Sequence, residues 1–555
     1  MTVALAGAVL VCAAAGWRYL VRARRMLHLL QLEHYENARL YLWLRRRGEL
    51  ADPAQSATQV ALAIVGLVLA ATGPAVAELI AWVALLVALA VFARREPPQG
   101  TIKPVVWTQR ARRLFGAALA PAALAVLLGI VLSVALDSDV PLAAAALVVV
   151  ACLELAAPAM TGANAALAPF QRRINRRFEA SARATLASVA PVVVGITGSY
   201  GKTTTKVCVG AVLAEQEPTL ITPASFNSYL GVIRTINEHL EPGHRDFVVE
   251  MGMYRAGDIT ELCELVHPQI GVLTAIGPVH LERMGSIEAI VDAKAELALA
   301  LPPDGHLVAN GDDPRCREIA ARVSVDTVLY AIEHPDAHVR AENIGLADGR
   351  THFELVIGDE RVAVSSGLLG RHNVSNLLAA AAVGHLRGMP GVEIARGLAA
   401  VEPPEHRLQP IPNPRAGIVV IDDAYNSNPA GAAAALEVLH SHPAKRRILV
   451  SPGMVELGDQ EEELNEAFGR QAAVVCDQVI LVGPTRTDPI NRGLRAAGFS
   501  ADAITVVRDI AEATAVLGRL TRAGDVVLFE NDLPDMYSET DPPIPPARRV
   551  AAGAA

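Results

Sequence analysis

Residues 195–206, GITGSYGKTTTK, have the residue types and spacing for phosphate chemistry. They follow the apolar run PVVV, so the pattern predicts a buried strand, a glycine turn and then a helix. The spacing G-x-x-G-x-x-G-K-T differs from the common nucleotide loop, which would need glycine at Ile196. Glycines let the backbone approach phosphate oxygens, and the helix N-terminus adds a favourable dipole. The predicted nucleotide-binding residues are Gly198, Ser199, Gly201, Lys202, Thr203 and Thr204.

In this arrangement Lys202 would reach the terminal phosphates and Thr203 would hold Mg²⁺. Three more residues end or follow predicted elements: Glu250 in DFVVEMG, His280 in IGVLTAIGPVHLERMG, and Lys294 in SIEAIVDAKAELALA. Parallel sheets place their ligands at the carboxyl ends of the strands. Each residue alone also fits an ordinary role, as a solvated strand end, a loop histidine or a surface lysine. Together they predict an active site.

The chain resembles the Mur ligase family, the ATP-dependent amide ligases of peptidoglycan assembly, and most of all its D-alanyl-D-alanine-adding branch. From about residue 190 to 460, the stretches that carry the resemblance are GITGSYGKTTTK, SFNSYLGVIRTI, VVEMGMYRAGDI, LTAIGPVHLERMGSIEAIVDAKAEL, NGDDP, GRHNVSNLLAAAAV, HRL, DDAYNSNP and GMVELGD. The resemblance implies a P-loop ATPase central domain with a parallel sheet (186–405) and a Rossmann-like C-terminal ligase domain (406–538). An α-helical membrane bundle (1–170) would precede this α/β part.

The resemblance also implies residue roles. The implied catalytic residues are Lys202, Lys294, His280 and Arg407. The implied metal ligands are Thr203, Glu250, His280 and Lys294, the last as a carbamate that helps to bind a second Mg²⁺. The residues implied to contact ATP beyond the glycine turn are Asn310, Asn373, Asn376, Arg407 and Asp423. A substrate carboxylate would take the γ-phosphate of ATP, and an amine would then displace phosphate from the acyl phosphate.

Three features depart from the family pattern. Tyr200 stands where the family usually has Asn or Ser. The stretch FENDLPDMY (529–537) replaces a Lys-Gly-Ser-type turn, which leaves recognition of a D-alanyl-D-alanine carboxylate open. Only about 30 residues separate the last predicted membrane span from the strand before the glycine turn, too few for the family's UDP-binding domain.

Residues 1–170 are dominated by Ala, Val and Leu. A helix needs about 20 mostly apolar residues to cross a bilayer. Five spans are predicted, in the segments 3–17, 60–92 (a hairpin broken at Thr72-Gly73-Pro74), 114–136 and 141–160. Arginine-rich linkers at 18–57, 93–113 and 171–177 are typical of cytoplasmic segments. This pattern predicts a multi-pass protein of the cell membrane with its ligase domains in the cytoplasm.

Several smaller features carry weaker signals. We expect Glu78 and Glu154 to reach the membrane interface, although an intramembrane acid is by default a functional candidate. Residues 26–47 could form one helix, either on the membrane surface or packed on the rest of the protein. The tail 539–555 is predicted to be disordered. A net charge of −9 argues against a nucleic-acid partner, and six scattered cysteines fit a reducing compartment.

The sequence therefore predicts a membrane-anchored, ATP-dependent carboxylate–amine ligase that acts through an acyl phosphate. Its amine would be an amino acid or a dipeptide. Its acceptor could be lipid-linked or polymeric, with the spans as part of the substrate site, or UDP-linked, with the spans as a mere anchor. A polyglutamate-type synthetase is an alternative with the same fold. An ATP-driven transporter is less favoured, because the spans lack the paired polar interruptions of a midplane substrate site.

Overall fold

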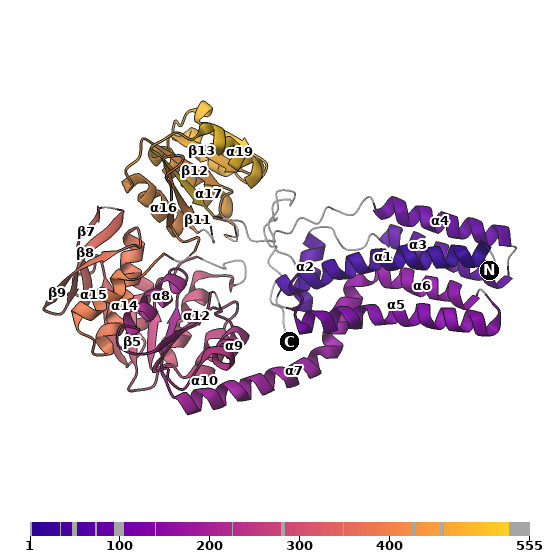
Figure 1. The fold of residues 1–555 in the computed structure, drawn as a ribbon, viewed down its shortest axis with the longest axis horizontal. Coiled ribbons are helices and arrows are strands. Elements are labelled where there is room, and N and C mark those ends of the chain that lie inside the picture. The colour runs from indigo at the N-terminus through magenta and orange to yellow at the C-terminus, as the bar shows by residue number, and fades with distance from the viewer. Residues whose placement is uncertain are drawn as a thin grey trace. The chain divides into compact units, whose positions relative to one another are not determined.

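The computed structural model describes residues 3–33, 35–46, 53–72, 75–93, 105–138, 140–224, 226–278, 284–347, 349–403, 405–424, 428–455, 457 and 460–531. The chain forms two compact units, which divide after Asn175 (Figure 1). The first is helical, and the second contains two β-sheets covered by helices. His280 and the tail 539–555 lie outside the described residues.

The helical unit contains long apolar helices that lie side by side (Figure 1). Its helices are α1 (Val3–Leu32), α2 (Asn37–Arg46), α3 (Pro53–Thr72), α4 (Ala75–Ala93), α5 (Gln109–Leu136), α6 (Val140–Glu154) and the first part of α7 (Ala156–Val189). Helix α1 contacts α4, α5 and α6, and α3 contacts α4 and α6. The fully buried Tyr19 and Trp82 belong to the resulting core.

The described residues of each predicted span are mostly helical, but two helix boundaries differ from the prediction. The segment 141–160 is two helices, α6 and α7, bent by 84° at the break. Pro158 explains the break, because it cannot donate to the carbonyl of Glu154 and its ring clashes there. The segment 26–47 is also not one helix, since α1 ends at Leu32 and Tyr35 has φ +65°. Helix α2 then buries Leu40 and Leu44 in the core of the helical unit, in line with the packed alternative.

Among the described residues, α5 alone has the length and composition to cross a membrane, and the bent pair α6–α7 would be a second span if counted as one. The prediction of five spans is therefore not confirmed. Glu154 is also less accessible than expected: only 7% of it is exposed, its carboxylate lies 3.8 Å from the guanidinium of Arg22, and it accepts a 2.5 Å hydrogen bond from Ser56. The side chain of Glu78 lies outside the described residues.

The second unit begins with a nine-stranded sheet of order β2-β3-β1-β4-β5-β6-β7-β8-β9. The strands are β1 (Val192–Thr197), β2 (Thr219–Ile221), β3 (Asp246–Glu250), β4 (Ile270–Leu273), β5 (His306–Asn310), β6 (Asp326–Ala331), β7 (Val339–Ala347), β8 (Arg350–Ile357) and β9 (Glu360–Ser366). The sheet is mixed, not wholly parallel as predicted: β7, β8 and β9 pair antiparallel. A two-residue turn joins β8 to β9, and Gly358 supplies the positive φ (+57°) that such a turn requires.

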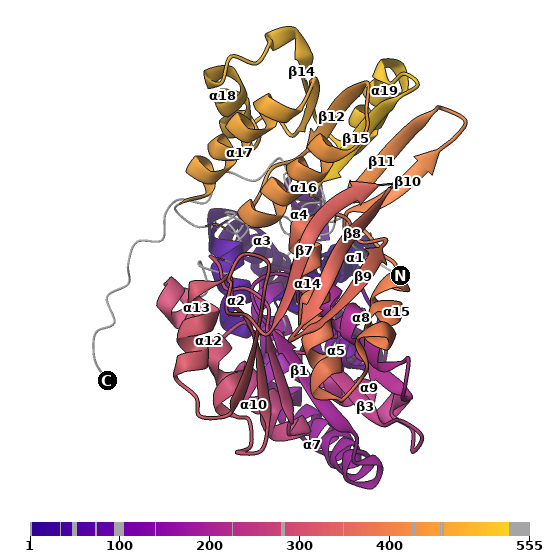
Figure 2. The same ribbon diagram turned by 90° about the vertical axis from the view of Figure 1, so that its left-hand side faces the viewer.

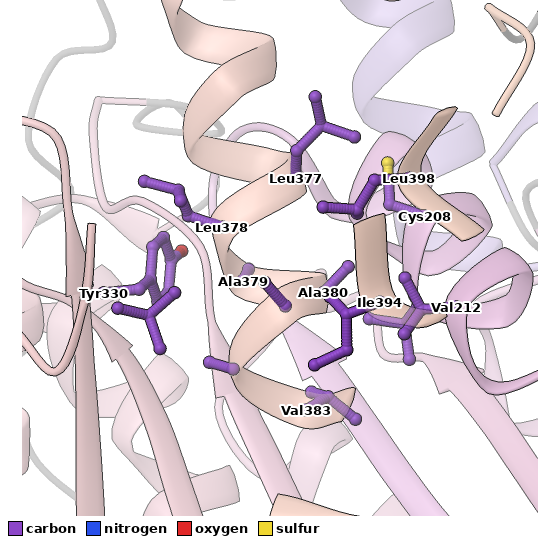
Figure 3. Packing of buried hydrophobic residues seen from close by; sticks show 14 of the residues in the cluster. Cys208, Val212, Tyr330, Leu377, Leu378, Ala379, Ala380, Val383, Ile394 and Leu398 are labelled. Atoms are coloured by element: carbon purple, nitrogen blue, oxygen red, sulfur yellow. The ribbon is translucent and has the colours of Figure 1, made fainter. Parts of the chain in front are cut away.

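Helices cover both faces of this sheet. They are α8 (Lys202–Leu213), α9 (Tyr229–His239), α10 (Asp258–Val266), α12 (Ile287–Leu299), α13 (Pro314–Ala321), α14 (Arg371–Leu386) and α15 (Gly391–Ala399). Helix α14 is the centre of one core, where Ala380 and Val383 face Ile394 of α15 and Val212 of α8, and Leu378 points toward Tyr330 of β6 (Figure 3). Alanines on α14 let α8 and α15 approach closely. The core therefore fixes the helix that carries the lysine of the glycine turn.

The last part of the chain forms a six-stranded sheet of order β10-β11-β15-β12-β13-β14. Its strands are β10 (Gln409–Asn413), β11 (Ile418–Asp423), β12 (Arg446–Ser451), β13 (Gln478–Val482), β14 (Ile504–Val507) and β15 (Asp525–Glu530). The described helices that accompany it are α16 (Pro429–Ser441), α17 (Glu461–Val475), α18 (Asp488–Ala496) and α19 (Ile510–Leu520). All pairs are parallel except β10–β11, a hairpin visible in Figure 2. The α/β alternation agrees with the predicted Rossmann-like fold.

Candidate active site

The glycine turn joins β1 to α8, as predicted. Gly201 has φ +77°, and a Cβ there would collide with Oδ1 of Asn376. A Cβ at Gly198 would collide with the hydroxyl of Thr274. Gly195 has another role, because it lies inside β1 and its missing side chain makes room for Met251. The turn thus needs glycine at 198 and 201 for its own close packing.

Two residues after β4 hold the turn in place. Ser199 donates its backbone N–H to Ala275 (2.6 Å) and its hydroxyl to the carbonyl of Gly277 (3.0 Å). Tyr200 packs against Gly277, and burial raises the pKa of its phenol to about 12. The departure at Tyr200 therefore adds a large, neutral ring that fixes the turn against the end of β4.

Lys202 begins α8, and its Nζ donates to the carbonyls of Gly198 (2.7 Å) and Ser199 (3.3 Å). Burial lowers the pKa of Lys202, Glu250 opposes that shift, and Arg407 adds to it. Thr203 follows on the same helix and is half-buried, and Thr204 is buried. The structure therefore places Lys202 within electrostatic range of both Glu250 and Arg407, residues that are far apart in the sequence.

Glu250 ends β3, and only 1% of it is exposed. Its carboxylate accepts hydrogen bonds from Lys206 Nζ (3.1 Å) and Asn227 Nδ2 (2.9 Å). Burial alone would raise the pKa of Glu250, but the charges of Lys206 and Lys202 and the hydrogen bonds hold it below its ordinary value. Glu250 is thus an ionised, buried carboxylate and not a solvated strand end.

Lys206 and Asn227 are site residues that the sequence analysis missed. Lys206 is 1% exposed and also donates to the carbonyl of Ala224, so it joins Glu250 to the segment before α9. A signal was present, since Lys206 lies one helical turn after Lys202 and directly before the apolar part of α8. A buried lysine in such a place needs a carboxylate partner, which here is Glu250.

Lys294 lies on α12, is 2% exposed and is therefore not a surface lysine. Its Nζ is 3.3 Å from the hydroxyl of Thr197 at the end of β1. Burial, with the nearby charge of Lys202, lowers the pKa of Lys294 well below its ordinary value, against the opposing charges of Glu296 and Glu250. A buried ammonium loses its proton more readily than an exposed one, so this environment favours the neutral amine of Lys294.

The predicted asparagines form hydrogen bonds in two places near the glycine turn. Asn376 accepts a hydrogen bond from Thr205 of α8 (3.1 Å) and donates to Asn373 (3.0 Å), which donates to the carbonyl of Leu369 (2.8 Å). Asn310, at the end of β5, donates to the carbonyl of Thr274 (2.8 Å). The structure brings Asn373 and Asn376 to the glycine turn and Asn310 to the end of β4.

Arg407 lies between two residues with positive φ, His406 (+59°) and Leu408 (+47°). His406 pairs with Asp422 (2.8 Å), and the N–H of Leu408 donates to Asp423 (3.1 Å), so the end of β11 fixes the Arg407 backbone. Burial raises the pKa of Asp423 to about 6, while Leu408 and Arg407 oppose that shift. Asp423 therefore acts here as a backbone acceptor that positions Arg407.

This arrangement suits a polyphosphate. A glycine turn at a helix N-terminus, Lys202, Lys206 and Arg407 converge with one carboxylate, Glu250. The described residues contain no group of three or more His, Cys, Asp and Glu side chains that could hold a metal, and His280 lies outside them. The hydroxyl of Thr203 and the carboxylate of Glu250 are nevertheless the hard oxygen donors that Mg²⁺ prefers. Fold and site together define a nucleotide-dependent enzyme of the phosphate-loop class.

Comparison with known proteins gives the family. Residues 196–384 match the Mur ligase middle domain, and residues 406–530 match the Mur ligase glutamate ligase domain. The chain is 33% identical over 340 residues to a UDP-N-acetylmuramoyl-tripeptide–D-alanyl-D-alanine ligase of Synechocystis sp., over 61% of this chain and 71% of the relative. It is 34% identical to the Mycobacterium tuberculosis ligase of the same name, over 61% of this chain and 70% of the relative.

A solved structure agrees. The MurF ligase of Thermotoga maritima in complex with ADP aligns with a TM-score of 0.58 and 27% identity, over 64% of this chain and 80% of that one. The chain belongs to the Mur ligase family. It is an ATP-dependent, ADP-forming ligase that joins an acid to an amine. The resemblance found in the sequence is thereby confirmed.

Proposed function

We propose that this chain is a membrane-anchored ligase that forms a peptide bond through an acyl phosphate. The reaction would belong to the synthesis of cell-wall or cell-envelope peptides. The observation that carries this proposal is the cluster of Lys202, Glu250 and Lys294 around the glycine turn. The central domain (186–405) would bind ATP, and the C-terminal domain (406–538) would bring the amine. The names of the relatives support a UDP-muramoyl tripeptide as acceptor and D-alanyl-D-alanine as amine.

The residues would divide the work as follows. The glycine turn and Lys202 would hold the phosphates, and Arg407 would approach from the C-terminal domain with a planar fork that donates to two oxygens at once. Asn310 would contact adenine, and Asn373 and Asn376 would keep α14 against the turn. These groups position charges where negative charge develops, so catalysis would rest on orientation and electrostatics, without a side-chain nucleophile.

Thr203 and Glu250, together with His280, would hold Mg²⁺, which would neutralise charge on the transferred phosphoryl group. Lys206 and Asn227 would keep the Glu250 carboxylate in place. The lowered pKa and the burial of Lys294 support a further step, the addition of CO₂ to its neutral amine. The resulting carbamate would supply an anionic oxygen to a second Mg²⁺.

The surface of the helical unit supports a membrane location. Only 11% of the most apolar stretch of α5 is buried, whereas a core helix would be mostly buried. The exposed apolar side chains of α5 are Leu124, Leu127, Leu128, Ile130, Val131, Leu132, Val134 and Leu136. The stretch from Leu114 to Leu136 is about 34 Å long, enough to cross a hydrocarbon core of about 30 Å. We propose a multi-pass anchor of the cell membrane, with the ligase domains in the cytoplasm.

The function can be tested by ADP release from the purified full-length protein, with Lys202→Ala as the inactive control. Acceptors would be a UDP-muramoyl tripeptide and lipid-linked or polymeric carboxylates, and amines would be D-alanyl-D-alanine, single amino acids and glutamate. Turnover with the UDP-linked acceptor would make the helical unit an anchor only. Turnover only with a lipid-linked acceptor would place the helical unit in the substrate site. No amine-dependent ADP release with any pair would overturn the proposed function.

A further inference from the structure

The helical unit contains a hollow that the ligase reaction does not explain. It lies between α5 and α7 and has about 240 Å³ of space, part of it open to solvent. The residues that line it are Arg110, Arg113, Leu114, Asn164, Leu167, Phe170 and Gln171. Two cationic side chains and three apolar ones therefore share one small hollow.

Neutral groups hold the two arginines in position. The guanidinium of Arg110 lies 3.7 Å from the ring centroid of Tyr35 and donates to Asn164 (3.2 Å). Asn164 is 8% exposed and is itself fixed, because its Nδ2 donates to the carbonyl of Tyr35 (2.9 Å) and to Asn37 (2.8 Å). This buried amide aims its oxygen at Arg110 and so orients the guanidinium.

Arg113 lies on the same helix and is oriented in a similar way, chiefly by residues of α7. Its guanidinium lies 5.2 Å from the ring of Phe170, and it donates to Gln171 (3.3 Å) and to the carbonyl of Gln109 (3.1 Å). Among the described residues, neither Arg110 nor Arg113 forms a salt bridge with a carboxylate. Two half-buried positive charges one helical turn apart thus have no anionic partner within that part of the chain.

The surroundings of the hollow indicate the kind of anion. The exposed large apolar side chains of α5 begin at Leu124, about three helical turns beyond Arg113, and continue to Leu136. The hollow therefore lies at the basic end of a helix whose other end exposes apolar side chains. A guanidinium fork matches phosphate oxygens in a bidentate way. Leu114, Leu167 and Phe170 provide an apolar wall, which a free phosphate would not use but a lipid would. The phosphate would meet the two guanidinium groups at the open side of the hollow, and the acyl chains would lie along α5.

We propose that Arg110 and Arg113 bind the phosphate of an anionic membrane phospholipid whose acyl chains lie against α5. This inference rests on the proposed membrane location of the helical unit. It assigns a specific lipid site to a unit that would otherwise serve as an anchor.

Native mass spectrometry of the full-length protein in neutral maltoside micelles tests the site, with phosphatidylglycerol and phosphatidylcholine as probes. The wild type should retain phosphatidylglycerol at least tenfold more than phosphatidylcholine. The double variant Arg110→Gln/Arg113→Gln should lose this preference. The charge-matched control is Arg112→Gln/Arg173→Gln, which removes one exposed arginine from each of α5 and α7, the two helices that border the hollow, and should stay within twofold of the wild type.

Three results would overturn the proposal. An equal loss in the control variant would indicate diffuse charge attraction, and full displacement of phosphatidylglycerol by millimolar inorganic phosphate would indicate a free-anion site. Equal retention of both lipids by the wild type would show that the protein does not select an anionic headgroup. If the double variant misfolds, Arg110→Lys/Arg113→Lys keeps the charge without the fork and should still lower the preference several-fold. Carbonate extraction of membranes tests the location separately. Extraction of the protein would refute the membrane anchor, whereas retention without lipid preference would refute the lipid site alone.

Discussion

Helices α5 and α14 consist of similar residues but expose them differently. On α14, Ala379, Ala380, Ala381 and Ala382 are all fully buried, and the helix lies inside a protein core (Figure 3). On α5, Leu127 is 59% exposed and Val134 is 81% exposed. In water, such a surface would lose the free energy that burial of apolar area supplies, roughly 25 cal/mol per Å². The contrast teaches that composition alone does not distinguish a buried core helix from one with an exposed apolar face; the neighbouring helices do.

Each of the two units contains a buried carboxylate that faces a basic side chain. Glu250 faces Lys206 at 3.1 Å in the candidate active site, and Glu154 faces Arg22 at 3.8 Å in the helical unit. We expect Glu250→Gln to reduce ATP-dependent turnover about a thousandfold, because the site would lose the proposed metal ligand and the counter-charge of two lysines. ADP release measures this effect.

Glu154→Gln is the matched control for that variant. It removes the same charge from the other unit and should leave turnover within about threefold of the wild type, on the scale where tenfold is about 1.4 kcal/mol. Comparable losses in both variants would contradict the assignment of Glu250 to the active site.

A charge on the exposed face of α5 should have the next largest effect. Leu128→Lys should disfavour membrane insertion by about 2.5–3.5 kcal/mol if this face contacts lipid. Val474→Lys, on the exposed face of α17, should leave the location of the protein unchanged. Membrane fractionation of both variants gives the comparison. If the two variants distribute between the fractions in the same way, the exposed faces of α5 and α17 contact the same solvent.

A larger side chain at equivalent alanines should separate the two environments. Ala380→Leu overpacks a fully buried position and should cost about 1–3 kcal/mol of stability. Ala120→Leu, at an exposed position of α5, should cost less than about 0.5 kcal/mol. Differential scanning fluorimetry can compare the two transition temperatures. A greater loss at Ala120 would mean that the exposed face of α5 is packed in the native protein.

The smallest expected effect concerns two helix N-caps. Thr108 accepts from the N–H of Ala111 (3.1 Å) at the start of α5, and Asn428 accepts from the N–H of Gly431 (2.9 Å) at the start of α16. Each substitution by alanine should cost about 1 kcal/mol, because both caps satisfy one N–H at a helix start. Chemical denaturation followed by far-UV circular dichroism measures both. A much larger loss at Thr108 would indicate that it also fixes the nearby hollow.

Local pattern was enough to predict the glycine turn, β1, β3, β4 and α12, since each is a continuous run with clear signals. It was enough for the position of Lys294, but its burial and its contact with Thr197 depend on the packing of α12 on the sheet. The ion pair of Lys206 with Glu250 joins residues 44 positions apart, which no local period encodes. The bend before α7 was not predicted, although Pro158 is a signal for it, because the segment 141–160 is almost wholly apolar and therefore resembles one continuous span. The antiparallel strands β7–β9 were not predicted, although Gly349 and Gly358 lie in the short turns that join them, because a glycine in a short turn does not by itself define the direction of strand pairing.

The surplus of positive charge around Glu250 has a consequence for assays of this enzyme. Lys202 and Lys206 both interact with this single carboxylate and with the charge of Arg407. Burial, and then the charge of Lys202, lowers the pKa of Lys294 in the same cluster. Such a cluster attracts any compact polyanion, not only the triphosphate. Sulfate and inorganic phosphate should therefore compete with the nucleotide, raising its apparent KM as buffer anion concentration increases. The choice of buffer salt becomes part of the measurement.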